Sequence, residues 1–310
     1  MMRRQWQRYG NSLAVSGLWR TAPWAFALLL VTAAVATPTA AAAASLLPLT
    51  TEQAQTLPSG TAEAIIGLAY FDDGRYPPFT PAGALRRQTL IEGPQLSFHI
   101  GAGDWAEFQA SYETIYLDEQ ATNGQTNKQF GGGDARFFAK FRLRRESERF
   151  PALGMRFGTK LPDATRDSRL GTDDTDFGGD VLLSKDFGPL VAHANLGILL
   201  LGNSGPTIGH SFQAGGQDDL FDYNLAVVSQ PLGAKESGAT TVRLMAELTG
   251  FSGSHYGNDR NAVRFGLQMT RGAGTIYLGT SAGLVTASEN IGASAGFIYS
   301  FDAASLFRDE

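Results

Sequence analysis

The sequence has no cysteine at all, and only four of its 310 residues are histidine. The lack of cysteine excludes disulfide bonds, thiol catalysis, cysteine-ligated zinc and iron–sulfur clusters. Charged residues make up only 18% of the chain, and the net charge of −5 gives no reason to expect nucleic acid as a partner. After residue 45 there is no apolar run of about 18 residues, the length that a membrane-spanning helix needs. If this part of the chain spans a membrane, we expect it to do so as a closed β-barrel.

Glycine and aromatic residues are abundant instead. The chain contains 37 glycines, and aromatic residues make up 11% of it. This composition suits many short strands and turns, and it does not suit a disordered chain. The length is sufficient for one large barrel or for two ordinary domains.

The first 44 residues have the pattern of a secretory signal. Arginines precede an apolar run at residues 24–35, and alanine-rich sequence ending in Ala42-Ala43-Ala44 follows it. We predict a signal peptide over residues 1–44, cleaved before Ser45. A retained membrane anchor is the alternative, but the apolar run is short for a helix of about 20 residues.

The segment Ser294–Phe301 alternates between two faces, with aromatic and apolar residues on one and small, mostly polar residues on the other. This period of two is typical of a strand with lipid on one side. Its order of Ser294, Gly296, Tyr299 and Phe301 resembles the C-terminal assembly signal of bacterial outer-membrane β-barrels. We expect this strand to pair with the first strand, with Phe297, Tyr299 and Phe301 towards lipid.

Eleven further segments show this alternation, least cleanly at 275–284, and have about the length that a tilted strand needs to cross a bilayer. The twelve expected strands are 61–71, 88–100, 105–117, 134–145, 153–161, 174–185, 192–200, 220–229, 240–251, 261–270, 275–284 and 294–301.

The connections between these strands alternate in length over most of the chain. Those after the second, fourth, sixth and tenth strands are tight, whereas those after the first, third, fifth and seventh are long and polar, as at Asp72–Arg86 and Asp118–Gly131. Short periplasmic turns and long external loops are typical of bacterial barrels. We therefore predict an all-β fold, an antiparallel transmembrane β-barrel of about twelve strands with both termini periplasmic; a soluble β-sandwich is the alternative. The expected parts are a signal peptide (1–44), a periplasmic lead-in (45–60), the barrel (61–301) and a periplasmic tail (302–310).

If the apolar faces meet lipid, the charged residues between them face the lumen, because a charge at the lipid midplane costs about 2–4 kcal/mol. They form a basic wall between two acidic ones. One interpretation is an ion network that rigidifies a narrow barrel, and the other is a pathway that selects solutes by charge. The candidates are Glu107, Glu113, Arg136, Lys140, Arg142, Arg156, Lys160, Asp174, Asp176, Asp180, Arg243, Glu247 and Arg264.

Motifs for catalysis and metal binding are weak. His210 and Ser211 are adjacent in a loop, where a base and its nucleophile rarely assemble, and His193 fits a hydrogen bond to Asp180 in the lumen better. The acidic residues between Asp163 and Asp174 do not have the spacing of an EF-hand-like calcium loop. We therefore predict no enzyme activity, no cofactor and no metal site.

The stretch from Gly132 to Gly202 resembles a known family, the outer-membrane β-barrels named for a meta-pathway of phenol degradation. The resemblance is carried by the order and spacing of several short strings. These are Gly133-Asp134-Ala135-Arg136, Lys140-Phe141-Arg142-Leu143, Pro151-Ala152-Leu153, Gly158-Thr159-Lys160-Leu161-Pro162, Leu170-Gly171-Thr172, Thr175-Asp176-Phe177, Leu183-Ser184-Lys185 and His193-Ala194-Asn195-Leu196-Gly197. The resemblance implies an outer-membrane protein that takes up aromatic or other small compounds, and it supplies no catalytic residues.

Together these observations predict a porin-like channel or passive transporter for small solutes in the outer membrane of a Gram-negative bacterium, with aromatic or hydrophobic compounds as candidate solutes. A non-transporting structural or receptor-like barrel is the alternative, and an outer-membrane hydrolase is the third possibility. The expected partners are outer-membrane lipid, the barrel-assembly machinery and a small solute, with no nucleic acid.

Overall fold

The computed structural model describes residues 49–72, 85–121, 123–164, 170–171, 174–202, 220–233, 239–252, 259–286 and 288–303. The predicted signal peptide, most of the tail after Phe301, and the pair His210 and Ser211 lie outside these ranges. In the described part of the chain, no helix is both long enough and apolar enough to cross a membrane.

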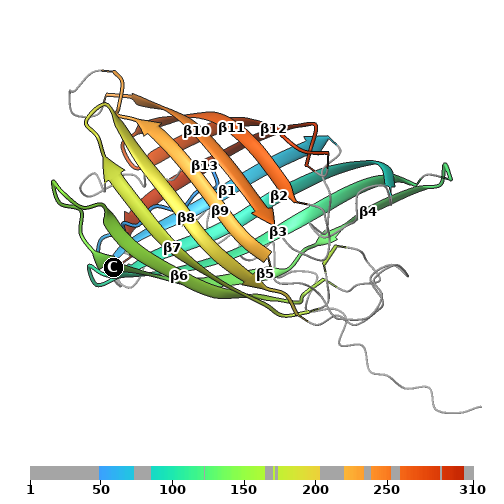
Figure 1. Ribbon diagram of the computed structural model, residues 1–310, viewed down its shortest axis with the longest axis horizontal. Helices are drawn as coiled ribbons and strands as arrows, with labels where there is room; N and C mark the ends of the chain where they lie inside the picture. The colour runs from blue at the N-terminus through green and yellow to red at the C-terminus, as the bar shows by residue number, and fades with distance from the viewer. Residues whose placement is uncertain are drawn as a thin grey trace, which may run out of the picture. The chain divides into compact units, whose positions relative to one another are not determined.

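The described chain forms one antiparallel sheet of 13 strands (Figure 1). The strands are β1 (Thr61–Asp72), β2 (Leu85–Ala102), β3 (Ala106–Ala121), β4 (Thr126–Gly132), β5 (Ala135–Arg144), β6 (Ala152–Leu161), β7 (Asp176–Asp186), β8 (Leu190–Leu200), β9 (Leu220–Ser229), β10 (Thr241–Ser252), β11 (Arg260–Arg271), β12 (Gly274–Gly283) and β13 (Ile291–Asp302).

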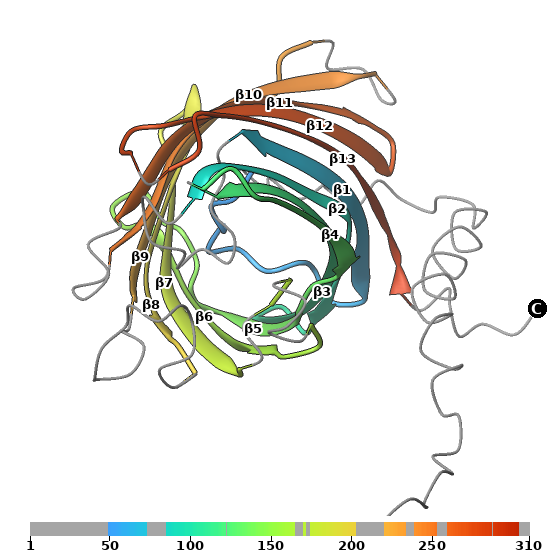
Figure 2. The same ribbon diagram turned by 90° about the vertical axis from the view of Figure 1, so that its right-hand side faces the viewer.

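The sheet closes on itself, as the end-on view in Figure 2 shows. Consecutive strands pair along the wall, and β13 pairs with β1 from Thr61↔Asp302 to Asp72↔Ile291, as predicted for the last strand. The short β4 and the following β5 both pair with β3, β4 along one half of it and β5 along the other. They share one place in the wall, so the barrel has the predicted twelve strand positions.

The stretch Asp118–Gly131, expected to be a loop, is instead mostly a hairpin. Strand β3 continues to Ala121, and β4 returns beside it to Gly132, with Gly124 at a φ of 85° in the turn. Polar side chains on both strands concealed this hairpin in the sequence, because its backbone pairing does not depend on an apolar face. It projects past the other strands at the end of the barrel that carries the long loops (Figure 1).

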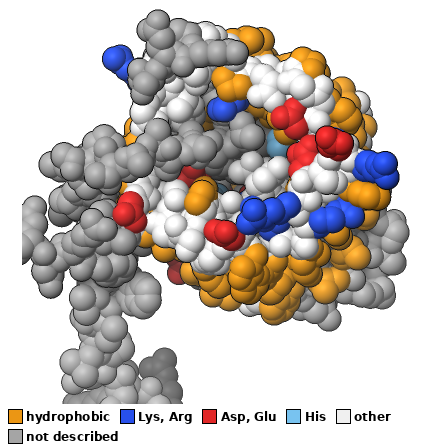
Figure 3. All heavy atoms as spheres, turned by 90° about the vertical axis from the view of Figure 1, so that its left-hand side faces the viewer, with side chains coloured by type: hydrophobic (Ala, Val, Ile, Leu, Met, Phe, Trp, Pro, Cys, Tyr) orange, Lys and Arg blue, Asp and Glu red, His pale blue; other side chains and the backbone are white. Residues whose placement is uncertain are grey.

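Large hydrophobic side chains cover the outer wall, as the predicted alternation requires. Leu68 is 54% exposed, Phe108 51% and Phe297 41%, while Ile298 and Ser300, the neighbours of Phe297 and Tyr299 on β13, are buried. Figure 3, viewed from the end with the short turns, shows hydrophobic side chains over the outer wall and charged ones around the rim. A closed barrel with this surface is suited to contact with lipid.

Candidate functional site: the lumen and its N-terminal plug

Two inward-facing cations of β5, Arg136 and Lys140, each have a carboxylate partner on β3. Arg136 lies 2.7 Å from Glu113, and Lys140 lies 3.1 Å from Glu107. Lys140 and Glu107 are both only 1% exposed. Buried charges are stable in such a site only when they are paired and hydrogen-bonded.

The cations of β6 are paired in the same way with β7. Arg156 lies 2.9 Å from Asp180, and Lys160 lies 2.9 Å from Asp176 and 3.1 Å from Asp134. The basic wall and the acidic walls predicted from the sequence are therefore interleaved as cross-strand ion pairs. This geometry supports the network interpretation, and a role in selecting solutes stays a prediction.

Three other predicted lumen charges lie apart from this network. Arg142 is at the end of β5 and donates to the backbone carbonyl of Asp104 in the turn between β2 and β3. Asp174 comes just before β7, at the end with the long loops. Arg243 is half-buried on β10, and its Nε has no hydrogen-bond partner in the described chain.

The inside of the barrel is occupied by the segment that precedes β1, which we call the plug (residues 49–58). The sequence predicts a periplasmic lead-in here, but Thr51, Ala54 and Leu57 of this segment are buried. The blue trace in Figure 2 runs within the ring of strands. A turn leads the chain from the lumen into β1 of the wall: Thr61 donates its N–H to the carbonyl of Pro58 (3.0 Å), and Gly60 takes a φ of 77°.

Polar side chains of the wall hold the backbone of the plug at successive points. The N–H of Leu57 donates to Glu107 (2.9 Å), and the N–H of Thr50 donates to both carboxylate oxygens of Glu247 (3.1 Å each). Since Glu107 belongs to β3 and Glu247 to β10, the plug crosses the lumen from one wall to another. Glu247, a predicted lumen charge, thus contributes a plug contact.

Near the middle of the plug, Ala54 donates its N–H to the hydroxyl of Ser184 (2.9 Å). That hydroxyl also lies 2.8 Å from Nδ1 of His193. His193 therefore hydrogen-bonds to Ser184 and not to Asp180, which was the expected partner. The difference arises because Ser184 and His193 are directly opposite in the β7–β8 register, whereas Asp180 is opposite Gly197.

Glu52 is the charged residue at the centre of the plug. Its carboxylate lies 3.0 Å from Arg156 and 3.3 Å from Lys140, and it accepts a hydrogen bond of 3.4 Å from the amide of Gln109. Its backbone N–H and C=O both bond to the side-chain amide of Asn195, each at 2.7 Å. Burial alone would raise the pKa of Glu52, but Lys140 and Arg156 outweigh it and lower that pKa to about 2.

The plug could not be predicted from the sequence, because Thr51–Leu57 has neither the period of a strand nor that of a helix. Its glutamate and glutamines also give it the composition of a solvated leader. The one local feature that could have suggested a reversal is Pro58-Ser59-Gly60, a turn sequence directly before the first strand. Whether the segment before this turn lies inside or outside the barrel depends on partners that are far away in the sequence.

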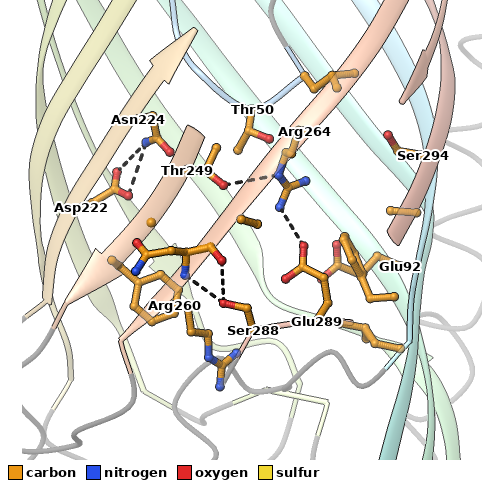
Figure 4. Close-up of a pocket in the computed structure, with 18 of the residues that line it drawn as sticks. Thr50, Glu92, Asp222, Asn224, Thr249, Arg260, Arg264, Ser288, Glu289 and Ser294 are labelled. Carbon is orange, nitrogen blue, oxygen red and sulfur yellow. Dashed lines mark hydrogen bonds and ion pairs between the residues drawn. The ribbon is translucent and has the colours of Figure 1, made fainter. Parts of the chain in front are cut away.

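Between the plug and the end with the long loops lies a chamber of about 480 Å³, with Leu49 and Thr50 among its lining residues. Figure 4 shows Arg264 pointing towards Glu289, 3.9 Å away, with Glu92 nearby on another wall. Phe71, Leu90 and Phe251 are among the apolar lining residues. The chamber can therefore accommodate a small solute that carries both polar and apolar groups.

A second cavity of about 260 Å³ lies beside Glu52. It shares Leu49, Thr50, Gln95, Arg156 and Tyr277 with the chamber, so the two spaces adjoin.

No family model and no curated protein matches the sequence. Among solved structures, the COG4313 outer membrane channel from Pseudomonas putida F1 is similar with a TM-score of 0.59 at 13% identity, over 83% of this chain and all of that one. The TodX deltaS2S3 mutant monoaromatic hydrocarbon channel gives a TM-score of 0.40 at 8% identity, over 79% of this chain and 91% of that one. Outer membrane phospholipase A from Escherichia coli gives 0.40 at 12% identity, over 84% and 95%.

The first likeness shows the fold, and the other two are too distant to carry an argument. The fold is that of a bacterial outer-membrane β-barrel, and its apolar outer wall fits that membrane. The resemblance to the phenol meta-pathway family stays a prediction.

Proposed function

We propose that this protein is a passive outer-membrane channel for small solutes, and that displacement of the plug opens it. The observation that carries the proposal is the position of residues 49–58 inside the barrel, between the chamber and the end with the short turns. A barrel of about twelve strands has a narrow lumen, so one strand-like segment is enough to obstruct it.

The chemistry of the plug contacts supports a movable segment. Its backbone bonds go to side chains of the wall, at Glu107, Ser184, Asn195 and Glu247, and not to a strand ladder. Such bonds can be replaced by water or by a polar solute when the segment leaves. The strand pairing that closes the barrel from β1 to β13 does not include the plug, so the wall can stay intact.

The solved channel with the same fold is consistent with this proposal. The solutes would be small, and the resemblance to the phenol meta-pathway family adds aromatic and hydrophobic compounds as candidates. The mixed lining of the chamber, with Phe71 and Leu90 beside Glu92 and Arg264, suits compounds of that kind.

The test is the conductance of refolded protein in planar bilayers. A variant lacking residues 45–58 should conduct several-fold more than the full mature chain, because the obstruction is gone. The same refolded samples should give the same far-UV circular dichroism. Absence of conductance and of solute flux in both forms would overturn the channel proposal.

A reversible lock provides a sharper version of this test. Ala54 of the plug packs against Ala152 of β6, and the chain has no cysteine of its own, so Ala54→Cys with Ala152→Cys can form only one intramolecular disulfide. Oxidation should hold the channel at its lowest conductance, and a reductant should restore it. The single variant Ala54→Cys is the matched control. Equal conductance of the oxidised and the reduced double variant would mean that the plug does not control opening of the channel.

The projecting β3–β4 hairpin favours a second candidate, a receptor-like barrel that presents this element outside the membrane. A barrel of that kind would keep its plug in place, so the full mature chain should show neither conductance nor solute flux. An outer-membrane hydrolase is the third possibility, and an assay of phospholipid hydrolysis by the refolded protein tests it.

A further inference from the structure

We propose that the site now filled by the Glu52 carboxylate is the binding site for a carboxylate group of the transported solute, so that the channel is selective for small organic carboxylates. This inference rests on the proposed channel function, and it adds the chemical class of the solute. Glu52 stands in the closed state where the solute's carboxylate stands during passage.

The donors around Glu52 are of the kinds that bind a carboxylate. An ammonium (Lys140, 3.3 Å), a guanidinium (Arg156, 3.0 Å) and a primary amide (Gln109, 3.4 Å) converge on one carboxylate from β5, β6 and β3. Charge-assisted donors of these types are the usual partners of carboxylates in binding sites. The group they surround belongs to the plug and not to the wall, so it leaves when the plug leaves.

Other residues of the wall keep these donors in place without Glu52. Glu107 holds Lys140 at 3.1 Å and also accepts a hydrogen bond of 2.8 Å from Gln109. Arg156 is held by Asp180 at 2.9 Å, and its guanidinium lies over the ring of Phe138, 4.6 Å from the ring centre. Because the donors are preorganised, a second carboxylate can replace the first without rebuilding the site.

The charges around the site also fit a monocarboxylate. Once Glu52 has left, the two cations Lys140 and Arg156 are balanced by Glu107 and Asp180 on the wall. A monocarboxylate then restores the same net charge that Glu52 provides in the closed state. A neutral solute of the same shape would leave the donors Lys140, Arg156 and Gln109 without the anion that they bind in the closed state.

A small solute can reach the site from the chamber. The cavity of about 260 Å³ beside Glu52 adjoins the larger chamber, and it is lined by Phe138 and Tyr277 as well as by Arg156 and Gln109. A small molecule with a flat apolar body can therefore reach the carboxylate site from the chamber.

Benzoate and benzamide form a matched pair of probes, since they have nearly the same shape and differ in charge. We expect benzoate to bind the variant lacking residues 45–58 about tenfold more tightly than the full mature chain, because Glu52 competes for the site in the latter. Isothermal titration calorimetry in detergent measures this ratio. Benzamide should bind both forms at least tenfold more weakly than benzoate binds the open form.

In bilayers, benzoate should raise the open probability of the full chain, whereas benzamide should not. Glu52→Gln should remove this benzoate dependence, because the amide no longer competes as an anion. Glu148→Gln, on an exposed turn, is the control and should behave as the parent chain does. Equal binding of benzoate and benzamide to the plug-deleted barrel would overturn the carboxylate site.

Failure of this inference is distinguishable from failure of the channel proposal. A plug-deleted barrel that conducts but does not distinguish benzoate from benzamide leaves the channel intact and removes the carboxylate site. A plug-deleted barrel that binds benzoate but never conducts keeps the site and overturns the channel, and with it the role of the site in passage.

Discussion

At the scale of single residues, Glu52 has the largest consequences. It is the plug residue whose side chain joins the ion network of the wall, and it contacts β5, β6 and β3 through Lys140, Arg156 and Gln109. Lys140 and Arg156 keep their wall partners Glu107 and Asp180 when Glu52 is absent, so the wall does not depend on this carboxylate. A change at Glu52 is therefore expected to act on plug release more than on the barrel itself.

The low pKa of Glu52 makes a prediction about pH. This pKa is about 2 in the closed state, below the usual 4.5 that applies when the plug is released, so ionised Glu52 favours the closed state. The difference corresponds to about 3 kcal/mol. This contribution is complete above pH 4.5 and is lost as the pH falls from about 4.5 through 2. Conductance should thus be unaffected by Glu52 between pH 7 and 5, and it should rise below that range.

Bilayer recordings over this pH range test the prediction, with Glu52→Gln as the comparison. The variant should conduct more at pH 7 and should lack the part of the acid response that Glu52 causes. Identical pH profiles for the two proteins would show that another group controls the plug.

At the scale of elements, β13 combines two tasks. Its outward residues meet lipid, and its inward face includes Gly296, which is opposite Tyr277 of β12 and Gly67 of β1 in the same row of the wall. A side chain at Gly296 would collide with the ring and the hydroxyl of Tyr277 and with the backbone carbonyl of Ile66. The glycine of the predicted assembly signal therefore has a packing reason that is independent of assembly.

Replacing Gly296 by valine should destabilise the barrel by about 1–3 kcal/mol, because the ring of Tyr277 must move. Urea unfolding of the protein refolded into lipid vesicles measures this loss. Ala295→Val, which places its methyl groups on the outer face of the same strand, should have little effect. Adding Tyr277→Ala should recover part of the loss in Gly296→Val; if it does not, the collision with Tyr277 is not the cause.

At the scale of the whole molecule, the inner wall near the plug is a set of cross-strand ion pairs around a removable segment. The pairs Arg136–Glu113, Lys140–Glu107 and Arg156–Asp180 link neighbouring strands. Because each of these cations has a carboxylate partner, the wall is close to neutral around the plug. Its selectivity should then depend on which member of a pair is removed.

In the barrel without residues 45–58, Arg156→Gln should shift the reversal potential towards cations, since Asp180 loses its partner. Arg156→Lys keeps the charge and should stay close to the parent. Arg142→Gln should leave selectivity unchanged, because Arg142 bonds to the carbonyl of Asp104 at a turn. Measurement in a KCl gradient decides this, and an unchanged potential in Arg156→Gln would leave the ion pairs with a purely structural role.

Much of the fold was determined by the sequence alone. Alternation along β13, with Phe297 and Tyr299 outward and Ile298 inward, follows from the period of two, and it sets which side of the wall meets lipid. The twelve strand positions and the pairing of β1 with β13 could be predicted for the same reason. These properties are local, or they follow from the need to close every backbone hydrogen bond in lipid.

Only the tertiary structure decided what fills the lumen. Thr51–Leu57 has no period of its own, and its buried position depends on Ser184, Asn195 and Glu247, which lie more than 100 residues away in the chain. The hairpin of β3 and β4 was also concealed, because backbone pairing between polar strands does not produce an apolar pattern. The contacts of a segment without periodicity depend on residues that are distant in the sequence, and closure of the barrel brings those residues together.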